Sequence, residues 1–305
     1  MLKKFASLMT LLLPAISTYA QAIWFSPNAG PSDYMALFQP DAPWQQVSTH
    51  IQTFCFSCNQ VFNPSWGINL PDMLSDLRRR HISLEVGMSP LSGDGHCGFH
   101  VEGYSNAAQP LSDARRLKAA GAEVSCYAMD EPFYYGHVFT GQNACHASIE
   151  DIAKDVAAKV KQVRSIYPGV GIGDVEPVGI PYGNWLSDLE QWFDAFNAAT
   201  GSPLAFFRVD MQWGANWQGQ MRQLAALLRR KGIPLQVIYN GSGNDRSDAA
   251  WTAQAAKHFR DYEASGLPKP DVAVFQCWTK NPTRMLPETD PSTLTGLVLQ
   301  YIKSR

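Results

Sequence analysis

Two short acidic segments contain the residue types that proton-transfer chemistry requires. The segment 123–132, EVSCYAMDEP, ends in two adjacent acids and a proline, and the segment 169–177, GVGIGDVEP, has two acids separated by one residue. Neighbouring carboxylates can act as a general acid and a general base, because their mutual repulsion raises the pKa of at least one of them. Both segments are therefore candidates for a shared acidic active site.

Both acidic segments have the pattern of β-strands, in which successive side chains point to opposite faces. The sequence contains eight strand-like runs, and most are followed by apolar residues at helical spacing. About eight strand–helix repeats favour an α/β fold in the form of a closed (β/α)8 TIM barrel with a single domain. The predicted strands lie at 23–28, 50–56, 82–89, 123–132, 169–177, 204–213, 234–240 and 272–278.

Alternating polarity predicts which strand positions face the inside of the barrel. In the sixth predicted strand, apolar Phe207 and Val209 alternate with polar Arg208 and Asp210, and the third strand alternates in the same way. A strand of an open sheet covered on both sides would be almost entirely apolar, so the polar face is expected to point inward. An internal ion pair between Glu85 and Arg208 is one consequence.

The same alternation assigns four acids to the mouth of the barrel. Active sites of α/β barrels lie at the carboxyl ends of the strands, where Glu131, Asp174, Glu176 and Asp210 are expected. Asp130 falls on the opposite face, at the flank of the site. Carboxylates separated by about 5 to 9.5 Å suit the hydrolysis of a glycosidic bond.

Aromatic residues gather in the predicted loops around this mouth. Flat rings beside polar groups suit the apolar faces of sugars. The aromatic loop residues are Trp66, Phe133, Tyr134, Tyr135, Tyr182, Trp213, Trp217 and Trp278.

These features together resemble the secreted (β/α)8-barrel glycoside hydrolases. The segment 129–132, MDEP, is similar to the Asn-Glu-Pro ending of the fourth strand in the large retaining clan, and Trp278 resembles the aromatic platform of that clan. The resemblance implies that Glu131 is the general acid/base. It differs at the seventh strand, where the clan has a nucleophilic glutamate and this sequence has Tyr239 and Asn240.

The sequence and the resemblance predict hydrolysis of a polysaccharide or oligosaccharide by a monomer that needs no cofactor and no metal. Glu131 is expected to protonate the leaving oxygen, and Glu176 or Asp210 is expected to be the nucleophile or the base for water. The expected substrate-binding residues are Asp130, Asp174, Trp213, Tyr239, Asn240, Trp278, Trp66 and Tyr127.

Two other functions remain open from the sequence. A metal-dependent hydrolase or lyase on the same barrel could use His96, His100, His137 and His146, although these residues lie in predicted loops and lack the spacing of a typical metal site. A barrel that binds a polysaccharide without cleaving it is the second alternative. The four acids expected at the mouth argue against it.

The N-terminus has the pattern of a secretory signal peptide. Two lysines precede an apolar run at 5–16, and small residues follow. The run is shorter than the ~20 residues of a typical membrane span. Residues 1–22 are therefore expected to be a signal peptide and 23–305 a secreted or periplasmic catalytic domain, with no membrane contact after cleavage.

The net charge argues against one class of partner, and the cysteines predict a disulfide. Removing the two N-terminal lysines from 25 basic residues leaves 23 against 27 acidic ones, which argues against a nucleic-acid-binding surface. Export would permit disulfides, and Cys97 and Cys145 in polar loops are the expected bridge. Cys55 and Cys58 could form a local bridge or a redox pair, and the remaining two cysteines are expected to be buried.

Overall fold

The computed structural model describes residues 21–31, 33–93, 95–180, 182–214 and 216–305. Residues 1–20 of the expected signal peptide lie outside the described residues. No helix among the described residues has the length and apolar character that a membrane span requires.

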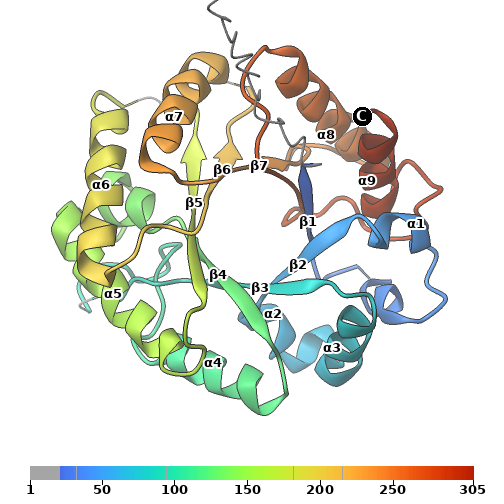
Figure 1. Cartoon of the computed structure of the whole chain (residues 1–305), viewed down its shortest axis with the longest axis horizontal. Coiled ribbons are helices and arrows are strands. Elements are labelled where there is room, and N and C mark those ends of the chain that lie inside the picture. The colour runs from blue at the N-terminus through green and yellow to red at the C-terminus, as the bar shows by residue number, and fades with distance from the viewer. Residues whose placement is uncertain (1–20, 32, 94, 181, 215) are drawn as a thin grey trace, which may run out of the picture.

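Eight parallel strands form a closed barrel surrounded by helices, which confirms the predicted single-domain (β/α)8 architecture (Figure 1). Each strand pairs with the next in chain order, and β8 pairs with β1 to close the barrel. The strands are β1 (Ala22–Ser26), β2 (Ile51–Ser57), β3 (Ser83–Met88), β4 (Val124–Asp130), β5 (Gly171–Val178), β6 (Phe207–Met211), β7 (Leu235–Tyr239) and β8 (Val272–Gln276).

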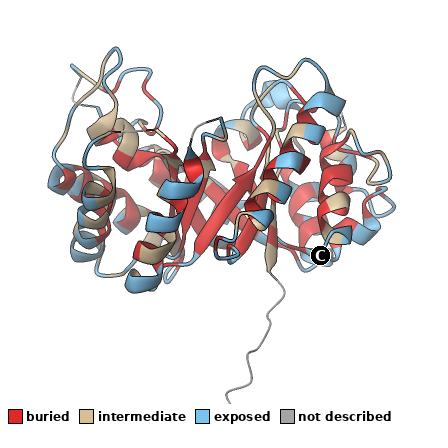
Figure 2. Cartoon of the chain, turned by 90° about the horizontal axis from the view of Figure 1, so that it is seen from above, coloured by how far each residue is buried: buried red, intermediate tan, exposed pale blue. Residues whose placement is uncertain are grey.

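The helices bury one side against the barrel and expose the other (Figure 2). In α5 the apolar stripe of Ile152, Val156 and Val160 is buried, and Ser148 caps the helix by accepting the backbone N–H of Asp151 at 3.1 Å. The helices are η1 (Tyr34–Phe38), α1 (Gln45–Ser48), α2 (Cys58–Val61), η2 (Pro64–Trp66), α3 (Leu70–Arg79), α4 (Gln109–Ala119), η3 (Tyr134–Val138), α5 (Ile149–Arg164), α6 (Trp185–Thr200), α7 (Trp217–Lys231), α8 (Asp248–Ala264) and α9 (Leu294–Lys303).

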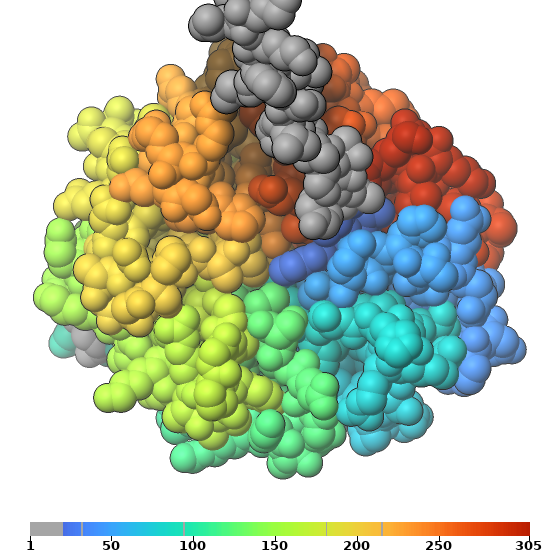
Figure 3. Space-filling view, in the orientation of Figure 1, coloured from blue at the N-terminus to red at the C-terminus, as the bar shows by residue number. Residues whose placement is uncertain are grey.

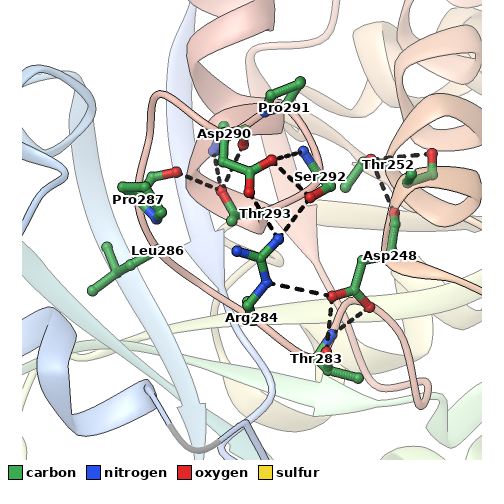
Figure 4. Close-up of polar contacts among 12 residues, drawn as sticks. Asp248, Thr252, Thr283, Arg284, Leu286, Pro287, Asp290, Pro291, Ser292 and Thr293 are labelled. Carbon is green, nitrogen blue, oxygen red and sulfur yellow. Dashed lines mark hydrogen bonds and ion pairs between the residues drawn. The ribbon is translucent and has the colours of Figure 1, made fainter.

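Successive segments follow one another around the molecule, so the first and last described segments lie side by side (Figure 3). The loop from β8 to α9 is fixed by polar contacts (Figure 4). The carboxylate of Asp248 accepts the N–H and hydroxyl of Thr283, each at 2.8 Å, and Arg284 donates to Asp290 at 2.8 Å. These contacts anchor the loop that carries Trp278.

A buried ion pair crosses the interior of the barrel, as the alternation of polar residues predicts. Arg208 Nη1 donates to Glu85 Oε1 at 2.7 Å, Nη2 donates to the second carboxylate oxygen, and Nε donates to Gln236 Oε1 at 2.8 Å. The side chains of Glu85 and Arg208 are each 2% exposed. The rings of Trp24 and Phe206 lie 5.4 and 5.0 Å from the guanidinium carbon. Each of the three guanidinium nitrogens therefore donates to a side-chain oxygen.

We expect Glu85→Ala to lower the free energy of unfolding by about 3–5 kcal/mol, because it leaves the Arg208 guanidinium buried without its counter-charge. Urea unfolding followed by far-UV circular dichroism measures this loss. The control is Asp261→Ala, which breaks the exposed Lys257–Asp261 pair on α8 and should cost less than about 1 kcal/mol. Equal losses for the two variants would contradict the assigned role of the internal pair.

Candidate active site

A cavity of about 940 Å³ opens where the strands end. Residues at or near the carboxyl ends of all eight strands line it, as in other α/β barrels. Six acids are among the lining residues. Glu85 is paired with Arg208, and Asp113 lies on α4 and accepts from Gln109. The other four, at the mouth, are Glu102, Asp130, Glu131 and Asp210. The cavity is therefore the candidate active site.

Both acids at the end of β4 line the cavity, although they are consecutive in the chain. Asp130 pairs in register with Val175 and lies on the same face as Ala128, which packs inside the barrel. Glu131 follows with a φ of 49°, a left-handed conformation that is unfavourable for a residue with a Cβ. This turn ends the strand alternation. The prediction that Asp130 lies at the flank was therefore wrong, while Glu131 is at the mouth as expected.

The two acids of β5 point away from the cavity, so their predicted place at the mouth was wrong. Val175 and Pro177 line the cavity instead. Asp174 accepts a hydrogen bond at 2.7 Å from the indole of Trp192 in α6. Glu176, also buried, lies on the same outer face. The inward face of β5 begins with Gly171 and Gly173 and has no polar side chain. The polar face of this strand is therefore its outer face, the reverse of what the alternation rule assumes.

Glu176 fixes the turn that carries Glu131. Its carboxylate accepts the backbone N–H groups of Phe133 at 2.7 Å and Tyr134 at 3.0 Å. The N–H of Glu131 donates to the carbonyl of Val175 at 3.1 Å. Successive contacts from β5 thus hold the backbone at and after the left-handed residue, and Glu176 positions Glu131 from outside the cavity.

Burial and mutual repulsion raise the proton affinity of the cavity acids. Burial, and then the charge of Asp210, raises the pKa of Glu131 to about 10. Burial and Glu102 raise the pKa of Asp130 to about 7, and the same two causes, with Asp130, raise that of Asp210 to about 7. At neutral pH the site therefore holds a protonated Glu131 beside two carboxyls that are close to half ionised.

The sequence interpretation did not identify Glu102, which comes from the loop between β3 and α4. Tyr135 donates its hydroxyl proton to Glu102 at 2.8 Å. A Cβ on Gly103 would lie 2.8 Å from the carbonyl oxygen of Asp130, so only glycine lets this loop approach β4 so closely. Glu102 and Gly103 follow the predicted strand at 82–89. An acid beside a glycine in such a loop was the sequence signal that could have indicated Glu102.

A disulfide joins two loops near the mouth. Cys97 and Cys145 are bonded, as the sequence predicts. They tie the β3–α4 loop, which carries Glu102, to the loop before α5. Cys55 and Cys58 are free and buried, so the alternative of a local bridge was wrong. The remaining cysteines, Cys126 and Cys277, are buried as expected.

A cluster of aromatic and amide side chains lines the same cavity as the acids. Trp213 donates its indole N–H to Asn240 Oδ1 at 3.0 Å and stacks on the imidazole of His258 with the ring centroids 4.4 Å apart. The second contact of His258, at 2.7 Å, joins its Nδ1 to the carbonyl of Asn240. Trp278, which is 47% exposed, also lines the cavity. Three predicted binding residues, Trp213, Asn240 and Trp278, are thus brought together.

Three other predicted binding residues lie elsewhere. Tyr239 is fully buried among rings of α8 and α9, and Trp66 is not among the lining residues. Tyr127 borders the cavity only on the side of α4, beside Asp113, and its ring packs toward Tyr167. The side chains of Tyr127 and Tyr239 point to the helix layer because strand parity, not residue type, decides their direction. Trp66 lies in η2, outside the strands, and is exposed.

No group of three or more His, Cys, Asp or Glu in the described part of the chain is placed to hold a metal ion. The four loop histidines therefore do not form the site that a metal-dependent hydrolase would need. His137, for example, contacts the carbonyl of Ala147 at 2.8 Å through Nδ1.

Solved structures with the same fold include several enzymes that act on polysaccharides. An intracellular xylanase of Thermoanaerobacterium saccharolyticum is 10% identical, with a TM-score of 0.51 over 86% of this chain and 89% of the xylanase. A fungal β-1,4-galactanase is 12% identical, with a TM-score of 0.56 over 92% of this chain and all of the galactanase. A β-mannanase of Thermomonospora fusca is 13% identical, with a TM-score of 0.51 over 90% and 85%.

No protein-family model and no curated protein matches the sequence. The structural likeness confirms the resemblance to (β/α)8-barrel glycoside hydrolases at the level of the fold.

The different environments of Glu176 and Asp210 predict opposite effects on stability. Glu176→Gln places an amide NH₂ against a backbone N–H, and should lower the free energy of unfolding by about 1–3 kcal/mol. Asp210→Asn should raise the melting temperature by roughly 2–4 °C at pH 8, because it removes a carboxylate that the folded cavity disfavours. Differential scanning calorimetry of both variants measures these changes.

The rise in melting temperature expected for Asp210→Asn should depend on pH in one direction. A carboxyl whose pKa is raised by folding to about 7 stabilises the folded state at low pH and loses this contribution as pH rises through 7. The gain from Asp210→Asn should therefore shrink between pH 8 and pH 5. A gain that grows toward pH 5 would show that the Asp210 carboxylate is favoured by folding.

Proposed function

We propose that the protein is a glycoside hydrolase that cleaves a polysaccharide or oligosaccharide by carboxylate acid/base catalysis. The observation that carries this proposal is Glu131, which is 8% exposed, lines the cavity and has a pKa raised to about 10. A carboxylic acid that keeps its proton at neutral pH is what protonation of a glycosidic oxygen requires. Glu131 is therefore the proposed general acid, the role that the sequence predicts for it.

Asp210 is the proposed partner of Glu131. Glu131 gives its proton to the leaving oxygen while the bond from this oxygen to the anomeric carbon breaks. The ionised Asp210 either takes a proton from the attacking water or attacks the anomeric carbon itself. In the second case water then breaks the ester formed on Asp210, and the deprotonated Glu131 takes the proton of that water. Glu176 is not proposed for this step, since it lies outside the cavity and its carboxylate is used by the backbone.

The remaining lining residues supply contacts that a sugar chain would use. The rings of Trp213, Trp278 and Tyr134 can pack on sugar faces, and Asp130 and Asn240 can bind hydroxyl groups. The names of the structural neighbours, a xylanase, a galactanase and a mannanase, are consistent with a polysaccharide substrate. The disulfide and the expected signal peptide support secretion or a periplasmic location.

Glu131→Gln and Asp210→Asn should each reduce the release of reducing ends by about 10²–10⁴-fold, because general acid and base groups contribute that much to the rate. The assay uses a panel of bacterial and plant polysaccharides, with products identified by mass spectrometry. Asp261→Asn, which removes an exposed carboxylate on α8, is the matched control. Full activity of both cavity variants would refute the assignment.

Activity should depend on pH with two limbs. The partner carboxyl must be ionised, so the rate should rise as pH increases through about 7, the pKa of Asp210. Glu131 must stay protonated, so the rate should fall only as pH approaches about 10. Initial rates between pH 5 and pH 10 measure both limbs. An enzyme most active near pH 5 would exclude Asp210 as the base.

A further inference from the structure

Acidic residues outnumber basic ones in the lining of the cavity. Glu102, Asp130, Glu131 and Asp210 line its mouth, and among the described lining residues Arg208 is the one lysine or arginine. Arg208 lies deeper in the barrel, where Glu85 and Gln236 occupy its guanidinium. The four acids at the mouth therefore have no cation to balance them.

The acids are also short of hydrogen-bond donors. Within the described part of the chain, the side chains of Asp130, Glu131 and Asp210 accept no hydrogen bond, and Glu102 accepts one from Tyr135. Glu131 is more than nine-tenths buried and still open to the cavity. A buried carboxyl without a partner is costly unless a ligand supplies one. This second observation indicates that a donor-rich ligand completes the site.

We infer that the glycan bound in this cavity carries free ammonium groups, so that its repeating unit is a hexosamine without its N-acetyl group. This inference rests on the proposed function and names the substrate class. An ammonium group has three donors and a positive charge, and can therefore satisfy carboxylates that neutral hydroxyls would satisfy less well. A uronic acid or a sulfated sugar would add negative charge to an uncompensated acidic cavity.

The surroundings of the acids suit a cation in other respects. The rings of Tyr134, Tyr135 and Trp213 line the same cavity, and aromatic faces attract ammonium groups. The stacked imidazole of His258 adds no competing charge at neutral pH, since burial lowers its pKa. Glu102, at the exposed edge, is placed to meet a cationic chain before the buried acids do.

Binding of such a glycan should release protons. Positive charge beside Asp130 and Asp210 lowers the pKa of each carboxyl, and both pKa values start at about 7. Near neutral pH the bound ammonium groups therefore displace protons from these acids. Neutral sugars of the same length lack this effect, which gives the inference a signature independent of cleavage.

Isothermal titration calorimetry tests the inference with glucosamine and galactosamine oligomers of equal length, each in N-acetylated and fully de-N-acetylated form. At slightly acidic to neutral pH, one de-N-acetylated oligomer should bind at least about tenfold more tightly than its acetylated form, with affinity that falls as salt rises. Titrations in two buffers of different ionisation enthalpy should show proton release for that oligomer.

Glu102→Gln is the informative variant, because Glu102 lies at the exposed edge and its loss should leave the fold intact. It should weaken binding of the de-N-acetylated oligomer by about fivefold to tenfold and leave the acetylated one unchanged. Glu123→Gln removes an equal, exposed charge just before β4, at the opposite end of the barrel, and should change neither affinity.

The outcomes separate the inference from the proposed function. Equal or tighter binding of the acetylated oligomers, or equal losses for both forms in Glu102→Gln, would overturn the inference, and cleavage of neutral glycans would still support the hydrolase. Preferential binding of a de-N-acetylated oligomer with proton release, but without new reducing ends from any glycan, would support the inference and refute hydrolysis.

Discussion

The two backbone hydrogen bonds that Glu176 accepts fix the turn that carries Glu131, the central acid of the site. Glu131 leaves β4 in a left-handed conformation, which has a cost for any residue with a Cβ. The carboxylate of Glu176 and the carbonyl of Val175 hold the chain after and at this residue. An acid on the outer face of one strand thus decides where an acid at the end of the neighbouring strand lies.

Acids have three distinct environments in this barrel, and each environment determines what the acid does. Inside the barrel, Glu85 is neutralised by Arg208 and stabilises the interior. On the outer face of β5, Glu176 is buried but serves backbone donors. At the mouth, Glu131 and Asp210 have neither a counter-charge nor donors, and burial and the neighbouring acids raise the pKa of each group. The acids proposed for catalysis are therefore those that the fold leaves without a partner.

Sequence patterns predicted the architecture well because its causes are local and repeated. Strand–helix alternation indicated a closed eight-stranded barrel, and the polar face of the sixth strand indicated the Glu85–Arg208 pair. Two cysteines in polar loops indicated the disulfide. The same reasoning failed for Asp174 and Glu176, because polar residues on an outer face are tolerated wherever the neighbouring helix or turn supplies donors.

Three features follow from the order of residues alone: the eight strand–helix units, the acid at the end of β4 and the lack of an acid where β7 ends. Which acids share the cavity depends on how the strands and loops pack. The tertiary structure placed Asp130 beside Glu131, moved the acids of β5 to the outer face and brought in Glu102 from a loop between β3 and α4. The reason is physical: the direction of a side chain depends on register and on one backbone dihedral angle, and neither is encoded in the polarity of a single residue.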